Sequence, residues 1–122
     1  MPSCEKTIKE EDRPPQRGNI AWIRFEGVGH EQRGKRPIVV VSRNIFNHAS
    51  GFCWISPITS KQKGYPFEVV IPHGVCSISG VILGDQVRTI DWRARGILFT
   101  EDSVPEDIME DLALKQSLIL NG

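Results

Sequence analysis

Short apolar runs separated by glycine- and proline-containing turns dominate the middle of the chain. They predict strands at residues 20–25, 37–42, 52–58, 67–71, 80–83 and 86–90, with a short helical bend at 44–50. The 37–42 run, Pro-Ile-Val-Val-Val-Ser, is apolar on both faces, which is typical of a central strand. Short strands at this spacing indicate a compact, strongly bent antiparallel barrel.

The C-terminal segment changes to helical periodicity. Ile108, Leu112 and Ile119 form one apolar stripe at helical spacing. Ser103 is a candidate N-cap, followed by Pro105 near the first helical position and an acid three residues after the cap. We therefore expect a helix that closes one side of the barrel.

The first 17 residues differ from the rest. They are polar, contain Pro14-Pro15 and show neither helical nor strand periodicity, which predicts a mobile arm over residues 1–17. A chain of 122 residues is one domain's worth. The interpretation is thus an arm followed by a single domain over residues 18–122.

Composition excludes several classes of protein. Hydrophobic residues at 39% and charged residues at 25% are ordinary for a soluble globular protein. No apolar run approaches the roughly 18 residues of a membrane span, and the polar N-terminus lacks a secretory signal, so we expect a cytoplasmic protein without membrane contact.

Cys4, Cys53 and Cys76 fit no disulfide framework. His73 and Cys76 lack a second ligand pair, so we expect no metal.

Charge is balanced overall and uneven locally. Lys and Arg total 15, Asp and Glu total 15, and the formal net charge is zero. The basic residues lie mainly in the central segments, whereas the acidic residues crowd both ends. A local basic surface is therefore expected, although most individual charges are adequately explained as a solvated face.

Three dense motifs stand in order along the chain. Residues 29–37 read Gly-His-Glu-Gln-Arg-Gly-Lys-Arg-Pro, residues 63–70 read Lys-Gly-Tyr-Pro-Phe-Glu-Val-Val, and residues 84–96 read Gly-Asp-Gln-Val-Arg-Thr-Ile-Asp-Trp-Arg-Ala-Arg-Gly. Together they closely resemble the MazF/PemK (Kid) family of toxin endoribonucleases, also called mRNA interferases. The resemblance extends from residue 18 to the C-terminus.

The resemblance carries several expectations. It implies a mainly β fold with a C-terminal α-helix, an SH3-like small β-barrel of the CcdB/Kid/MazF type, assembled as a homodimer. It implies the toxin of a type II toxin–antitoxin system, which cuts single-stranded RNA at specific sequences without a cofactor. The implied partner is a MazE-like antitoxin whose acidic disordered tail covers the basic groove.

Metal-free RNA cleavage sets the chemistry to look for. The ribose 2′-OH is the nucleophile, and the products carry a 2′,3′-cyclic phosphate and a 5′-OH. A base, an acid and positive charge on the phosphorane are needed. His30, His48 and His73 are not paired in sequence, so two-histidine catalysis is not favoured. The 27–36 loop offers a carboxylate and arginines instead.

Three residues are predicted to be catalytic. Arg36 can place two donors on phosphate oxygens and stabilise the transition-state charge, and it can deliver a proton to the leaving oxygen. Glu31 acts as base or orients Arg36, and Thr59 donates a hydroxyl hydrogen bond. By resemblance, these match the family's catalytic arginine, loop glutamate and active-site threonine. Taken without the resemblance, a surface ion pair, a solvated acid and a turn hydroxyl are the simpler interpretations.

Five residues are predicted to bind RNA. Phe25 and Gln86 match positions that contact bases in relatives, and Lys35, Lys61 and Arg88 are expected to hold the backbone. Barrel core is the alternative for Phe25. The loop between Phe25 and Glu31 is a residue shorter than in the best-known relatives, which leaves the base preference open.

Two other functions fit the same fold. CcdB-like toxins poison DNA gyrase without nuclease activity, and an inactive SH3-like module would bind partners only. A gyrase poison does not need Glu31, Arg36 and Thr59, so this set favours the ribonuclease.

Overall fold

The computed structural model describes residues 14–24, 35–95, 97 and 99–122. The strands are β1 (Asn19–Arg24), β2 (Lys35–Val40), β3 (Cys53–Thr59), β4 (Glu68–Ile71), β5 (Gly80–Leu83), β6 (Arg88–Ile90) and β7 (Phe99–Ser103). The helices are α1 (Asn44–Ser50), α2 (Trp92–Arg95) and α3 (Glu106–Asn121). No helix in these ranges is both long enough and apolar enough to span a membrane.

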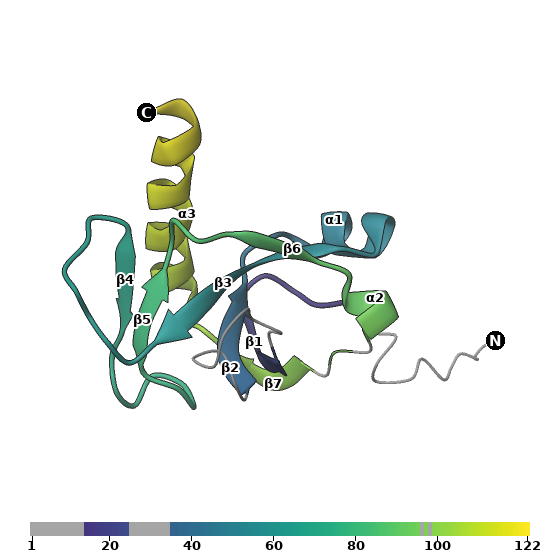
Figure 1. The fold of residues 1–122 in the computed structure, drawn as a ribbon, viewed down its shortest axis with the longest axis horizontal. Helices are drawn as coiled ribbons and strands as arrows, with labels where there is room; N and C mark the ends of the chain where they lie inside the picture. The colour runs from purple at the N-terminus through teal and green to yellow at the C-terminus, as the bar shows by residue number, and fades with distance from the viewer. Residues whose placement is uncertain (1–13, 25–34, 96, 98) are drawn as a thin grey trace.

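The strands form one bent antiparallel sheet (Figure 1) in the order β4-β5-β3-β2-β1-β7, with β6 paired to β3 off this path. β3 connects the two parts of the sheet. Its first part pairs with β2 and β6, and its last two residues pair with β5. β2 lies between β1 and β3, so the prediction of a central strand is confirmed. The mainly β class with a C-terminal helix is confirmed as well.

Both faces of the central strands are buried, which explains their continuous apolar sequence. Val39 and Ile20 face one core, which α3 closes with Met109 and Leu112. Ile38 and its neighbours face a second core, closed by Ile90 of β6 and Trp92 of α2. Because the cores occupy both faces, chemistry is left to the strand ends and to the outer surfaces of the helices.

The start of α3 differs from the sequence expectation. The N-cap is Pro105, without a side-chain cap, and Ser103 is the last residue of β7. The Ser103 hydroxyl instead accepts a hydrogen bond of 3.2 Å from Asn19 Nδ2 on β1. The predicted cap was wrong because pairing between β1 and β7 uses this serine first. The far part of α3 projects beyond the sheet (Figure 1), and Ile119 is 48% exposed there.

Residues 14–17, assigned to the arm, pack against the domain. Pro15 is fully buried and its carbonyl accepts a hydrogen bond of 2.8 Å from Asn47 Nδ2. Arg17 forms an ion pair of 2.8 Å with Glu106 at the start of α3. The rest of the predicted arm, residues 1–13, lies outside the described residues.

Cys53 is a small buried hydrophobe, as expected. It is fully buried in the core beside Ile55 and Trp92, and burial raises the pKa of its thiol to about 12. The thiolate is therefore strongly disfavoured, and Cys53 is unreactive in the folded protein.

Candidate active site

The pairing register brings two predicted catalytic residues together. β2 pairs with β1 through Ile23↔Arg36 and with β3 through Ile38↔Pro57. Arg36 lies two residues before Ile38 and Thr59 lies two residues after Pro57, so both residues lie at the same end of the β2–β3 pair. Residues near one another on neighbouring antiparallel strands, whether direct or diagonal neighbours, lie within reach of a long side chain such as that of arginine. A guanidinium and a hydroxyl can therefore reach one phosphate group from neighbouring strands.

Thr59 is held in place by its backbone surroundings. Its Oγ1 accepts a hydrogen bond of 3.2 Å from the Lys61 N–H, which leaves its own O–H hydrogen for donation. Thr59 pairs with Val81 of β5, and Gly80 approaches so closely that a Cβ there would lie 2.5 Å from the Thr59 carbonyl oxygen. The close packing of β5 thus positions the end of β3.

The loop after Thr59 is anchored by a buried carboxylate. Glu68 accepts hydrogen bonds from the backbone N–H groups of Lys63 (3.3 Å) and Gly64 (3.0 Å). Gly64 has φ +77°, a conformation that favours glycine. This part of the 63–70 motif is therefore structural, and it presents the exposed Lys61 next to Thr59.

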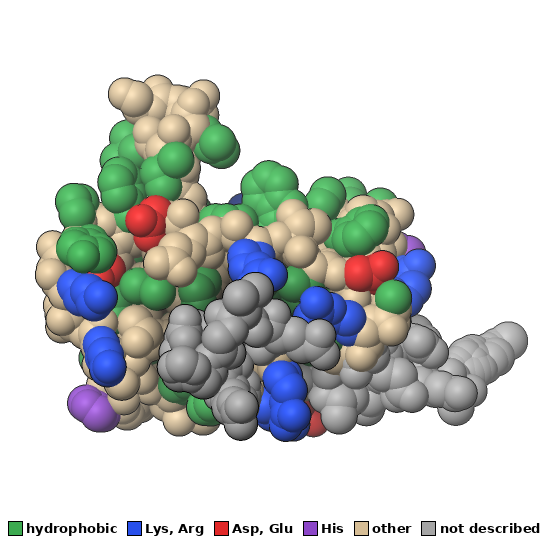
Figure 2. Space-filling model, in the orientation of Figure 1, with side chains coloured by type: hydrophobic (Ala, Val, Ile, Leu, Met, Phe, Trp, Pro, Cys, Tyr) green, Lys and Arg blue, Asp and Glu red, His purple; other side chains and the backbone are tan. Residues whose placement is uncertain are grey.

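The predicted RNA-binding residues fall on neighbouring elements. Arg88 pairs with Ile55, which lies four residues before Thr59 on β3, so strand alternation puts Arg88 and Thr59 on the same face. Gln86 is exposed in the segment leading from β5 to β6, and Lys35 is exposed at the start of β2. Figure 2 shows Lys and Arg side chains spread over the lower part of one face, below the apolar side chains of α3.

Two predicted residues are not placed. Glu31 and Phe25 lie outside the described residues, so their roles stay predictions. Within the part of the chain that is described, no three His, Cys, Asp or Glu side chains are grouped so that they could hold a metal ion. Among the predicted site residues, the structure describes Arg36, Thr59, Lys35, Lys61, Gln86 and Arg88, and their roles stay predictions.

The sequence analysis left two further arginines unassigned. Arg24 ends β1, Arg95 ends α2, and both line one cavity of about 460 Å³ together with Lys35. The signal for Arg24 was available, since it alternates with Ile23 on the predicted strand. Arg95 could not be placed, because four-residue α2 has no periodicity. Its neighbour Trp92 is structural: the buried indole Nε1 donates to the Asn47 carbonyl at 3.0 Å.

The chain is a small, mainly β protein with a bent antiparallel sheet and a C-terminal helix. It carries an arginine and a threonine at adjacent strand ends. The chain matches the family model of PemK-like, MazF-like toxins of type II toxin–antitoxin systems over residues 16–120. It therefore belongs to this family, and the prediction from the three motifs is confirmed.

Curated relatives support the assignment. The chain is 42% identical over 95 residues to the endoribonuclease toxin MazF of Escherichia coli K12, covering 77% of this chain and 84% of the relative. It is 35% identical over 109 residues to the Escherichia coli endoribonuclease PemK, covering 86% of this chain and 81% of the relative.

Solved structures agree with the fold. MazF from Deinococcus radiodurans superposes with a TM-score of 0.74 at 36% identity, covering 89% of this chain and 98% of that one. A MazE–MazF structure from the same organism gives a TM-score of 0.73 at 33% identity, covering 88% of this chain and 96% of that one.

Proposed function

We propose that this protein is a sequence-specific, metal-independent endoribonuclease that cleaves single-stranded RNA as the toxin of its toxin–antitoxin pair. The observation that supports the proposal is that Arg36 and Thr59 lie at the same end of the β2–β3 pair. A planar guanidinium and a hydroxyl that donate hydrogen bonds to one phosphate would stabilise the negative charge of the phosphorane.

The reaction follows from these groups. The substrate's 2′-oxygen attacks the adjacent phosphorus and loses its proton to a base, for which Glu31 is the candidate. The P–O5′ bond breaks, and the 5′-oxygen takes up a proton that Arg36 delivers. The products are a 2′,3′-cyclic phosphate and a 5′-OH. Arg36 and Thr59 stabilise the charge that builds on the non-bridging oxygens.

Substrate binding uses the cations and exposed polar groups around this pair. Lys35, Lys61 and Arg88 neutralise backbone phosphates, which gives a salt-dependent affinity. Gln86 offers both donor and acceptor atoms to a base edge, and Phe25 is the candidate stacking platform.

A homodimer is the proposed assembly. An apolar groove of about 470 Å³ runs between α1, β3 and the far part of α3, lined by Phe46, Trp54 and Leu120 among others. Leu120 is 75% exposed in the single chain. Figure 2 shows apolar side chains gathered along α3 and in the region of α1. Exposed apolar surface of this extent indicates a protein interface.

An antitoxin is the second proposed partner. The related Deinococcus radiodurans toxin has been solved in MazE–MazF form. We infer that the cognate antitoxin of this chain carries an acidic segment that covers the cations around Arg36, because complementary charge and direct overlap with the site would block RNA.

The test is a digest of a long single-stranded RNA in EDTA, with cut sites mapped by primer extension and 5′-OH ends detected by kinase labelling without prior dephosphorylation. Wild type is expected to cut at discrete sites. Arg36→Ala is expected to be slower by about 100-fold or more, and the isosteric Thr59→Val by about 10- to 100-fold. Arg43→Ala, at an exposed arginine beside α1, is the matched control.

Intact RNA after incubation with wild type would overturn the proposal and direct attention to gyrase. Cleavage by Arg36→Ala at the wild-type rate would overturn the assigned mechanism. Thermal melting of each variant separates a lost side chain from a lost fold.

A further inference from the structure

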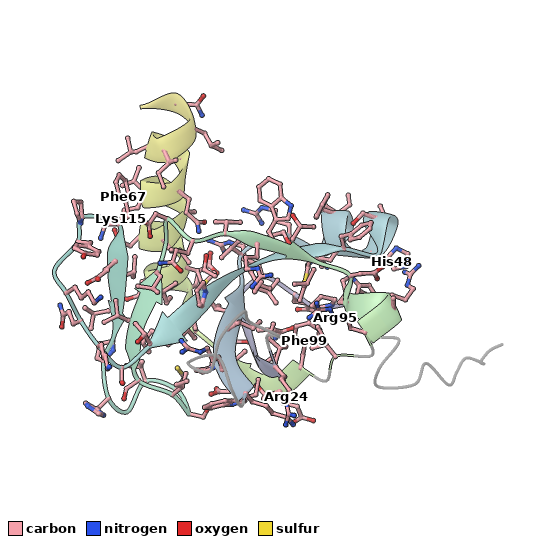
Figure 3. The ribbon with its side chains drawn as sticks, viewed as in Figure 1. Arg24, His48, Phe67, Arg95, Phe99 and Lys115 are labelled. Carbon is pink, nitrogen blue, oxygen red and sulfur yellow. The ribbon has the colours of Figure 1, made fainter. Side chains whose placement is uncertain are left out.

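A second cationic cavity lies at the ends of β1 and β2. It has a volume of about 460 Å³ and is lined by Arg24, Lys35 and Arg95, with Trp22 and Ile97 beside them. Three elements that are separate in sequence therefore converge on it. In Figure 3, Arg24 projects from the end of β1 and Arg95 from α2, with Phe99 between them in this view. The volume is within the range of small-ligand sites, roughly 300–1,000 Å³.

The three positive charges that line this cavity repel one another. Arg24 and Lys35 are direct register partners on adjacent strands. Like charges directly opposite each other destabilise an antiparallel pair. Arg95 adds a third positive charge, and none of the described residues that line the cavity is acidic. An anionic ligand would offset this repulsion. Among anions, two arginines favour a phosphate, because each guanidinium can donate two parallel hydrogen bonds to its oxygens.

An aromatic ring completes the cavity. Trp22 is 49% exposed, although its neighbours Ala21 and Ile23 are buried. An exposed indole beside clustered cations is the combination with which proteins bind single-stranded nucleic acid, because the base stacks on the ring while the cations hold the backbone. The ring makes a nucleotide the better fit than an acidic peptide.

The cavity is adjacent to the candidate catalytic arginine. The Arg24↔Lys35 pair follows the Ile23↔Arg36 pair by one residue, a rise of about 3.4 Å along the strand. Successive strand residues point to opposite faces, so Arg36 and Lys35 present their side chains on the two sides of the same strand end. A single strand of RNA that passes over this strand end meets both.

We propose that Arg24, Lys35 and Arg95 bind a backbone phosphate next to the scissile one, while Trp22 stacks on the base of that nucleotide. This inference rests on the proposed ribonuclease function and extends it with a flanking-nucleotide subsite. Arg24, Arg95 and Trp22 thereby become substrate-binding residues that hold the RNA across the end of β2.

The test is an anisotropy titration of a fluorescein-labelled RNA that contains a mapped cut site and is 2′-O-methylated throughout, so that no nucleophile is present. Wild type, Arg24→Ala and Arg95→Ala are compared, with Arg43→Ala as control. Each cavity variant is expected to bind about tenfold more weakly. The slope of log K against log[salt] is expected to fall by about 0.7 per lost phosphate contact, whereas the control matches wild type.

Three outcomes separate the possibilities. Wild-type affinity and salt slope in both cavity variants, from a protein that cuts RNA, would overturn the subsite and leave the ribonuclease intact. A wild type that cuts no RNA would overturn the function itself. If Arg24→Ala and Arg95→Ala bound a Glu-rich peptide more weakly than wild type does, but bound RNA as wild type does, the cavity would belong to a protein partner. That result would overturn the subsite. Arg24 and Arg95 are exposed, and circular dichroism confirms that their variants fold.

Discussion

Two surfaces of this protein contrast in how they are built. The strand-end surface, comprising Arg24, Lys35, Arg36 and Thr59, consists of polar side chains at the ends of β1, β2 and β3. The α3 groove, comprising Phe46, Trp54 and Leu120 with their neighbours, consists of apolar side chains on two helices and one strand. The first suits a flexible polyanion and the second suits a folded protein surface.

The contrast shows how a chain with zero net charge can bind RNA. Association with a polyanion depends on the local potential, which the clustered cations of the strand-end surface set. The α3 groove carries the apolar area that drives protein association. Because the two surfaces use different residues, each can be damaged separately, and each variant below tests that separation.

The largest expected effect is on the α3 groove. Trp54 is 43% exposed and packs edge-on against Phe46, with ring centroids 6.0 Å apart. Trp54→Glu would bury an unpaired carboxylate in the dimer interface, which costs several kcal/mol, so self-association should weaken by about 100-fold or more. Sedimentation velocity at micromolar concentration is the measurement, and a monomer is the expected result.

Val75→Glu is the control, since Val75 is 45% exposed in the loop between β4 and β5 and does not line the groove. It should sediment as the wild type does. A Trp54→Glu protein that stays dimeric would move the interface away from the groove. Fluorescence anisotropy with the 2′-O-methyl RNA then shows whether RNA contacts survive in the monomer.

The next effect concerns the geometry of the strand-end surface. Gly80→Ala would put a Cβ 2.5 Å from the Thr59 carbonyl oxygen, at a φ of +141°. Strain and overpacking should cost about 2–4 kcal/mol of unfolding free energy and displace Thr59. We therefore expect a lower denaturant midpoint together with slower RNA cleavage at a temperature where the variant is folded.

Gly74→Ala is the control that separates backbone strain at a positive φ from the steric contact with Thr59. Gly74 has φ +88° and nothing within 4 Å of its would-be Cβ, so only about 1–2 kcal/mol should be lost. Its cleavage rate should match wild type. Equal losses of activity in the two variants would show that Thr59 is not positioned by the approach of β5.

Much of this fold was accessible from the hydrophobic pattern. The strand predicted at residues 80–83 and the bend at 44–50 coincide with β5 and α1. Both are bounded by residues with strong local preferences: β5 begins at Gly80 and is followed by Gly84, and α1 is capped by Gly51 in the left-handed conformation. Pattern and turn chemistry agree at these points, so local physics decides the structure.

The elements that were not predicted depend on tertiary contacts. β7 reads Phe-Thr-Glu-Asp-Ser, a mostly polar sequence that becomes a strand by pairing with β1. α2 is a single turn anchored by Trp92 in the core. In the site, the family resemblance nominated Arg36 and Thr59, 23 residues apart in sequence, but only the pairing of β2 with β3 puts them at the same end of two neighbouring strands. The cavity of Arg24 and Arg95 needed the fold for the same reason.

The smallest expected effect concerns Asp102 of β7. Hydrogen bonds from Ser77 lower the pKa of its carboxyl, and they tie the β4–β5 loop to the sheet edge. A lowered folded-state pKa means that the charged form stabilises the fold above the unfolded pKa, about 4, and that this contribution disappears as pH falls through the folded value. Asp102→Asn should therefore lose about 0.5 kcal/mol or less at pH 7 after solvent screening, and this deficit should shrink as the pH falls, as measured by urea unfolding. A deficit that does not shrink as the pH falls would assign the loss to packing rather than to charge. An unchanged dimer and RNA affinity in this variant would show that the carboxylate supports the sheet edge without contributing to either surface.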